Sequence, residues 1–114
     1  MIGIIDYDAG NIKSVEKAVN ALGQETVVSR DPQMLLQADK VILPGVGAFG
    51  DAMGRLRQYG LEEVIREIAG RGTPFLGICL GLQLLFDSSE ESPGVKGLGL
   101  LPGKILRIPE KEGR

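Results

Sequence analysis

Short apolar runs alternate along the chain with stretches in which apolar residues recur every three or four positions. Runs of the first kind are typical of strands buried on both faces, and stretches of the second kind predict amphipathic helices. Strands are expected at 2–5, 26–28, 41–43, 75–78 and 104–108, and helices at 11–22, 31–36, 49–59, 61–68 and 80–86. This alternation predicts an α/β fold with an open, doubly wound, mostly parallel sheet of the flavodoxin-like type.

Two helix ends carry sequence signals of their own. Asp31 followed by Pro32 favours a helix start, because aspartate accepts a hydrogen bond from the first turn and proline suits the first helical position. Gly23 directly follows an apolar stripe that ends at Leu22, which is typical of the residue after a helix. Ligands of doubly wound sheets bind beyond the carboxyl ends of the strands. The loops that follow the strands are therefore the expected position of a site.

Composition restricts the class of protein. The 114 residues fit one domain, and 43% of them are hydrophobic. A net charge of −2 without a long basic run argues against contact with nucleic acid or an anionic membrane. The longest apolar stretch, 74–86, is too short to cross a bilayer, and the N-terminus lacks the basic region of a signal peptide. With a single cysteine, the sequence predicts a cytoplasmic protein.

That cysteine carries the clearest chemical signal. Cys79 lies between Gly77 and Gly81, after a predicted strand and before a predicted helix. This is the pattern of a nucleophile elbow, in which flanking glycines allow a sharp turn from strand to helix. A thiol at the first turn of a helix also lies near unpaired backbone N–H groups, which favour a thiolate. The pattern predicts acyl-transfer chemistry at Cys79, and a buried structural cysteine is the alternative.

A second glycine-rich loop also follows a strand and begins a helix. Gly45, Gly47 and Gly50 match the G-x-G-x-x-G pattern of dinucleotide sites. That pattern requires an acidic residue at the end of the next strand, but the acids at the right distance, at 62, 63 and 67, lie within a predicted helix. The loop can instead present backbone N–H groups to a developing oxyanion, beside the N–H that follows Cys79. A simple tight turn is the remaining alternative.

Other polar residues near these loops give weaker signals. Gln83 lies one turn after Cys79 and could meet a substrate, although a glutamine satisfied by backbone groups fits equally well. Asp6 and Asp8 end the first strand and are interpreted as part of a solvated loop, as is the Glu90–Glu91 pair. The chain contains no histidine, which is the usual base beside a cysteine nucleophile.

These motifs resemble the class I, triad-type glutamine amidotransferases. Gly77–Gln83 resembles their nucleophile motif, and Pro44–Gly47 resembles their oxyanion loop. Within the family, the segments 4–11 with 14–15, 43–53, and 83–86 with 89–91 are similar to the glutaminase subunits of imidazole glycerol phosphate synthases. The resemblance covers essentially the whole chain. It implies that residues 1–114 form the N-terminal part of a single glutamine amidotransferase domain.

The resemblance also implies a role for several residues. Cys79 would attack the carboxamide of glutamine and form a glutamyl thioester. Backbone N–H groups of the turn and of the residue after the nucleophile would stabilise the oxyanion; these residues are Val46, Gly47 and Leu80. The residues implied to hold the glutamine are Gly47, Gln83 and Glu91.

A partner protein is implied as well. Asn11 would lie at the interface with a (β/α)₈-barrel cyclase subunit. That subunit would receive the ammonia and form imidazole glycerol phosphate and aminoimidazole carboxamide ribotide, in histidine biosynthesis. Neither a cofactor nor a metal is implied.

The sequence departs from the family pattern in three ways. Asp8 and Leu82 stand where glycine and methionine are common, and the family's catalytic histidine and glutamate lie beyond position 114. We therefore expect these 114 residues alone to have no appreciable glutaminase activity. The alternatives are a flavodoxin-like module that binds a nucleotide or phosphate, and a half-domain scaffold. The exposed edge strand of such a half-domain favours self-association, which sedimentation would detect.

Overall fold

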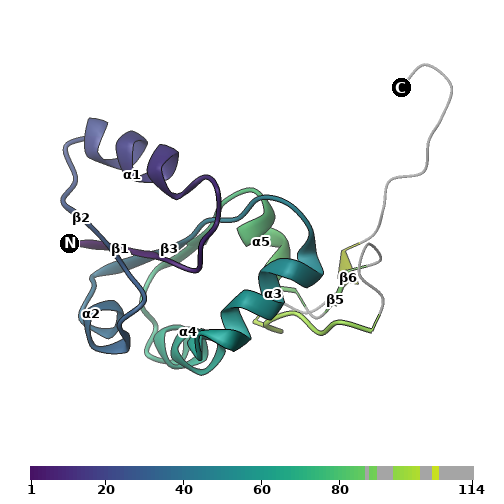
Figure 1. Cartoon of the computed structure of the whole chain (residues 1–114). Coiled ribbons are helices and arrows are strands. Elements are labelled where there is room, and N and C mark those ends of the chain that lie inside the picture. Colours follow the sequence, from purple (N-terminus) through teal and green to yellow (C-terminus); the bar gives the residue numbers. More distant parts are fainter. Residues whose placement is uncertain (87, 90–93, 101–103, 106–114) are drawn as a thin grey trace, which may run out of the picture.

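A four-stranded parallel sheet forms the centre of the computed structural model, which describes residues 1–86, 88–89, 94–100 and 104–105 (Figure 1). Its strands are β1 (Ile2–Ile5), β2 (Thr26–Ser29), β3 (Lys40–Leu43) and β4 (Phe75–Gly77), in the order β2-β1-β3-β4. β1 pairs with β2 on one side and with β3 on the other, so the winding direction reverses after β2. The predicted α/β fold with a doubly wound parallel sheet is confirmed.

Helices cover the two faces of this sheet unequally. The helices are α1 (Ile12–Ala21), α2 (Pro32–Leu36), α3 (Phe49–Gln58), α4 (Leu61–Gly70) and α5 (Leu80–Leu84). α1 lies on one face, and α2, α3 and α4 lie on the other (Figure 1). Residues alternate between the faces along each strand. Ile4 and Ile42 therefore pack against Val15 of α1, whereas Ile5 and Leu43 join the larger core under the other helices.

The side of the sheet that carries α1 is incompletely covered near β4. Leu76 is the register partner of Ile42, and its side chain is 57% exposed. An apolar groove of about 220 Å³ runs beside it, lined by Ile2, Ile42 and Phe75 among others. β4 is also an edge strand of this sheet, because it is the last strand in the order. Self-association through this edge stays a prediction.

The local helix signals are confirmed. The carboxylate of Asp31 accepts a hydrogen bond from the Gln33 N–H at 3.0 Å, and Pro32 is the first residue of α2. Gly23 adopts a φ of +82°, the left-handed conformation expected after a helix. Phe49, Met53 and Leu56, the predicted apolar stripe of α3, are fully buried.

The predicted elements differ from the structure mainly after Cys79. α5 ends at Leu84 instead of Phe86, because the N–H groups of Leu85 and Phe86 donate to carbonyls only three residues back, those of Leu82 and Gln83, both at 3.2 Å. The Leu84 carbonyl accepts from the Leu98 N–H at 2.8 Å, and the Phe86 carbonyl accepts from the Gly99 N–H at 3.2 Å. The structure also has a short strand, β5 (Ser88–Ser89), which the sequence analysis did not predict because two serines form no apolar run. β5 pairs with β6 (Lys104–Ile105) in a separate sheet. Positions 106–108 of the predicted last strand lie outside the described residues.

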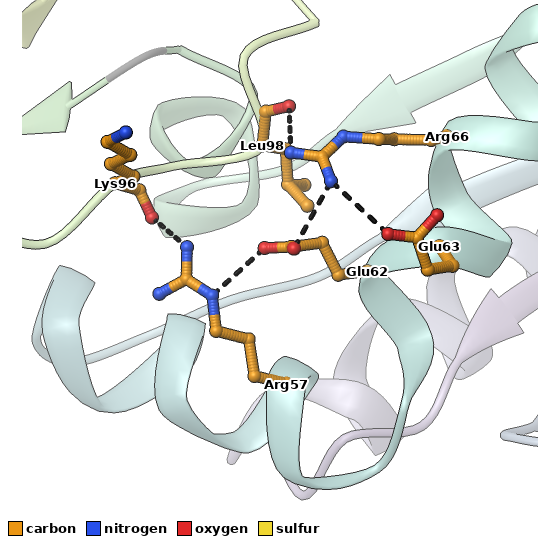
Figure 2. A network of polar contacts seen from close by, with 6 residues as sticks. All are labelled: Arg57, Glu62, Glu63, Arg66, Lys96 and Leu98. Carbon is orange, nitrogen blue, oxygen red and sulfur yellow. Dashed lines mark hydrogen bonds and ion pairs between the residues drawn. The ribbon is translucent and has the colours of Figure 1, made fainter.

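A network of ion pairs holds the segment 94–100 against the helices (Figure 2). Glu62, near the start of α4, pairs with Arg57 of α3 at 3.0 Å and with Arg66 of α4 at 3.2 Å. The two guanidinium groups in turn donate to main-chain carbonyls, Arg57 to that of Lys96 at 2.5 Å and Arg66 to that of Leu98 at 3.3 Å. Leu98 is thereby fixed in the core, where only 1% of it is exposed. Among the residues that the structure describes, no helix is long and apolar enough to span a membrane.

Candidate active site

The strand-to-helix turn at Cys79 has the geometry of a nucleophile elbow. β4 ends at Gly77 and α5 begins at Leu80, so Cys79 occupies the sharp turn between them. Its backbone adopts a φ of 55° and a ψ of −126°, a conformation that residues other than glycine rarely adopt. The side chain is exposed, so the alternative of a buried structural cysteine is wrong. The turn therefore presents the thiol at the carboxyl edge of the sheet.

The glycines around the elbow allow the backbones to pack closely. A Cβ atom added to Gly77 would lie 2.6 Å from the Cα of Leu82, and one added to Gly81 would lie 1.9 Å from the carbonyl oxygen of Leu43. Gly45, in the other glycine-rich loop, lies directly against this turn, since its added Cβ would be 2.6 Å from the backbone nitrogen of Gly81. The two loops singled out in the sequence therefore contact each other, at the end of β3 and β4.

The loop that contains Gly45 lies beside Cys79 and exposes part of its backbone. Val46 is 43% exposed, and Gly47 is exposed with a φ of +90°. The N–H of Leu80, predicted as an oxyanion donor, donates instead to the Gly45 carbonyl at 3.1 Å. The close packing of Gly45 on the elbow is the physical reason. In this conformation the Leu80 N–H becomes available to a substrate oxygen only when that hydrogen bond opens.

The loop after β1 holds the glycine-rich loop from the other side. The hydroxyl of Tyr7 donates to the Pro44 carbonyl, and the Asn11 side-chain amide donates to the Gly45 carbonyl at 3.5 Å. The Asn11 Oδ1 atom is buried without a partner among the described residues. β1 and β3 are the strands at which the winding reverses, which is the usual position of a site in such sheets. The sequence analysis did not predict a role for Tyr7. Its position just after β1, the strand beside β3, could have indicated that it lies near the loop after β3.

An apolar groove joins these features. Its volume is about 380 Å³, and Asn11, Val46, Ile78 and Cys79 line it together with one side of α1. The structure thus brings together three residues that the sequence singled out, namely Cys79, Val46 and Asn11. Gln83 is half-buried on α5, one turn after the thiol. Glu91 and the rest of the Glu90–Glu91 pair lie outside the described residues.

The acids after β1 remain at the surface, as predicted for a solvated loop, and both form ion pairs. Asp6 and Asp8 both pair with Arg30, at 3.4 and 3.0 Å. The acids that argued against a dinucleotide site lie within α4, as predicted, and one of them, Glu62, is bound by Arg57 and Arg66. A ribose-binding acid at the end of the next strand is therefore missing from the described residues of β4.

Tyr7 should make the stability of the fold pH-dependent in alkaline solution. Burial raises the pKa of Tyr7 from its ordinary value of 10.0 to about 12, against an opposing effect of the positive charge of Arg55. Between these two values the unfolded chain loses the phenol proton while the folded chain keeps it, so stability falls as pH rises. We expect a loss of about 3 kcal/mol over this window. Chemical denaturation of Tyr7→Phe should lack most of this decline, although the variant loses about 1 kcal/mol at neutral pH with its hydrogen bond.

The chain is similar over most of its length to proteins of one family. Residues 3–111 match the family described as Glutamine amidotransferase class-I. The chain is 58% identical over 108 residues to the imidazole glycerol phosphate synthase subunit HisH of Moorella thermoacetica, covering 95% of this chain and 51% of that protein. It is 53% identical over 109 residues to the subunit of the same name from Methanothermobacter thermautotrophicus, covering 96% and 54% of the two chains. The chain thus spans about half the length of these relatives.

Solved structures share the fold. A crystal structure of a glutamine amidotransferase superposes with a TM-score of 0.78 at 25% identity, over 93% of this chain and 56% of the other. A structure described as a putative peptidase E protein from Listeria monocytogenes superposes with a TM-score of 0.70 at 14% identity, over 88% of this chain and 62% of the other, which shows a shared fold alone.

Proposed function

Because the chain belongs to the class-I glutamine amidotransferase family, we propose that it carries the nucleophile of a glutaminase. The observation that supports this most is the contact between two loops: the positive-φ turn at Cys79 and the glycine-rich loop share one groove. A substrate amide in this groove would have the thiol on one side and backbone N–H groups of the Val46–Gly47 turn on the other. This is the arrangement that acyl transfer requires.

The proposed reaction has two steps. The Cys79 thiolate attacks the side-chain carbonyl carbon of glutamine, and the electron pair of the C=O bond moves to oxygen. When this oxyanion collapses, the C–N bond breaks, the nitrogen takes up a proton and ammonia leaves, so that a glutamyl thioester remains. Water then attacks the thioester, which releases glutamate and restores the thiol. The sum is glutamine and water giving glutamate and ammonia.

Residues 1–114 contain some of the groups that these two steps require. Cys79 supplies the nucleophile, and Val46, Gly47 and Leu80 supply the oxyanion donors, once the Leu80 N–H leaves the Gly45 carbonyl. Gln83 and Glu91 would contact the bound glutamine. The chain contains no histidine, so the proposal assigns proton transfer to groups outside residues 1–114. Residues 1–114 are then the N-terminal part of one amidotransferase domain, and inactive by themselves.

A finer assignment rests on the relatives. We propose that the complete protein is the glutaminase subunit of an imidazole glycerol phosphate synthase in histidine biosynthesis, because relatives with that name are 50–58% identical. It would pass ammonia to a (β/α)₈-barrel cyclase subunit in a cytoplasmic heterodimer, with Asn11 near the interface. Asn11 already uses its amide nitrogen within the chain, whereas its Oδ1 has no hydrogen-bond partner in the part of the chain that the structure describes.

A glutamine analogue tests the proposal directly. The diazo-ketone analogue 6-diazo-5-oxo-L-norleucine should alkylate Cys79 of the complete protein once per chain, and excess glutamine should slow the labelling. Intact mass and peptide mapping give the stoichiometry and the position. Iodoacetamide provides the control, since it modifies any exposed thiol and glutamine binding is not needed for its reaction. Labelling that glutamine does not slow, or tight nucleotide binding beside an unreactive Cys79, would favour the nucleotide-binding alternative.

A further inference from the structure

A cluster of three side chains near the candidate active site has no role in the proposed chemistry. Asp8, in the loop after β1, pairs with Arg30 at 3.0 Å and accepts a hydrogen bond from the hydroxyl of Tyr59. The guanidinium group of Arg30 lies 4.1 Å from the centre of the Tyr59 ring, where a cation is attracted to the aromatic face. The cluster thus connects three separate segments: the loop after β1, the loop after β2 and the end of α3.

The backbone at Asp8 suggests that this loop is held in place by its side chains. Asp8 adopts a φ of +66°, and outside the glycines the only other positive φ in the described residues belongs to Cys79. Aspartate tolerates this left-handed conformation better than most residues, but an unrestrained loop would still favour negative φ. The hydrogen bond from Tyr59 and the charge of Arg30 both hold the pKa of Asp8 below its ordinary value, so its carboxylate is charged at neutral pH.

Asp8 is next to the residues that support the glycine-rich loop. Tyr7 donates to the Pro44 carbonyl, and Asn11 donates to the Gly45 carbonyl. The Gly45 carbonyl is also the acceptor for the Leu80 N–H, which is the N–H that follows Cys79. A continuous series of contacts therefore runs from the cluster through loop 6–11 to the elbow.

We infer that Asp8, Arg30 and Tyr59 are positioning residues that fix loop 6–11 and thereby keep the Leu80 N–H on the Gly45 carbonyl. The positioning role does not depend on the proposed function, but its expected effect on the chemistry of Cys79 does. If Leu80 supplies an oxyanion donor, loosening the cluster frees that donor more often and accelerates attack by Cys79.

Amide hydrogen exchange tests the positioning role without requiring catalysis. Asp8→Asn keeps the shape and the tolerance of positive φ but removes one of the two carboxylate charges that pair with Arg30, the other being that of Asp6 at 3.4 Å. It should raise the exchange rate of the Leu80 amide about tenfold while the β3 amides change little, because local opening is separate from global unfolding. Tyr59→Phe, which removes only the hydroxyl, should act in the same direction. Glu67→Gln is the matched control, since it breaks an exposed ion pair with Arg71 on α4 and should leave Leu80 unchanged.

The outcomes separate the inference from the proposed function. Leu80 exchange that stays constant in Asp8→Asn and Tyr59→Phe, or that rises only together with β3 exchange, would overturn the inference. Labelling of Cys79 by the diazo-ketone analogue should also accelerate about threefold or more in Asp8→Asn, as expected from a more accessible donor. If the unsubstituted protein is not labelled at all, the proposed function fails, and the exchange result still decides the positioning role. If it is labelled without any acceleration in Asp8→Asn, the link from the cluster to the elbow chemistry is wrong.

Discussion

Under the proposed function, Cys79→Ser in the complete protein should lower kcat for glutamine hydrolysis by at least about 10³-fold with little change in KM, because serine is a far weaker nucleophile than a thiolate. Glutamine binding would persist, since the groove and the backbone donors do not depend on sulfur. Steady-state measurement of ammonia release gives both constants.

The folding control for this variant is straightforward. Cys79 is exposed, and serine has the same branching at Cβ, so the melting temperature should stay within a few degrees of that of the unsubstituted protein. A Cys79→Ser variant that folds and keeps more than about a tenth of the activity would exclude a covalent role for this residue.

Gly81→Ala should destabilise the fold by about 3 kcal/mol or more, which lowers the melting temperature by roughly 10 °C or more in a domain of this size. The added Cβ would lie 1.9 Å from the carbonyl oxygen of Leu43 and 2.9 Å from its carbonyl carbon. Both atoms belong to the backbone of β3, so neither can rotate away as a flexible side chain would. The elbow must separate from the sheet or the strand must shift.

Gly54→Ala is the matched comparison, because it adds the same methyl group. Gly54 lies within α3, and an added Cβ there meets no atom within 4 Å. It should stabilise the helix by about 0.5–1 kcal/mol, since alanine has the higher helix propensity. Thermal unfolding followed by circular dichroism measures both variants. If Gly81→Ala melts as high as Gly54→Ala, the close approach of the elbow to β3 is not a feature of the folded protein.

The sequence predicted the elements that depend on local chemistry. The apolar period located α3 and α4, and Asp31 with Pro32 predicted the start of α2. Gly77 and Gly81 predicted the turn at Cys79, because a turn of this sharpness excludes side chains on both sides. The contact of the two glycine-rich loops also followed from position, since both come after parallel strands that end at one edge of the sheet.

Other features depend on contacts between distant parts of the chain. The segment 94–100 docks through the N–H groups of Leu98 and Gly99 on the carbonyls of Leu84 and Phe86, and no local pattern shows where those residues lie. The pairing of Leu80 with Gly45 depends on how closely two loops pack, which their spacing does not reveal. Arg30 and Tyr59 are 29 positions apart in the sequence. No local pattern around either residue predicts its contact with Asp8.

The manner in which Arg57 and Arg66 contact the segment 94–100 has a consequence for tolerance to substitution. Both arginines bind main-chain oxygens, of Lys96 and Leu98, so the contact at position 96 is indifferent to which side chain stands there (Figure 2). Replacing an arginine by lysine is less tolerated, because one ammonium group cannot reproduce the separate directions in which a guanidinium group donates to a carboxylate and a carbonyl. Substitution of Lys96 should therefore leave segment 94–100 docked. Substitution of Arg57 or Arg66 by lysine should weaken that docking.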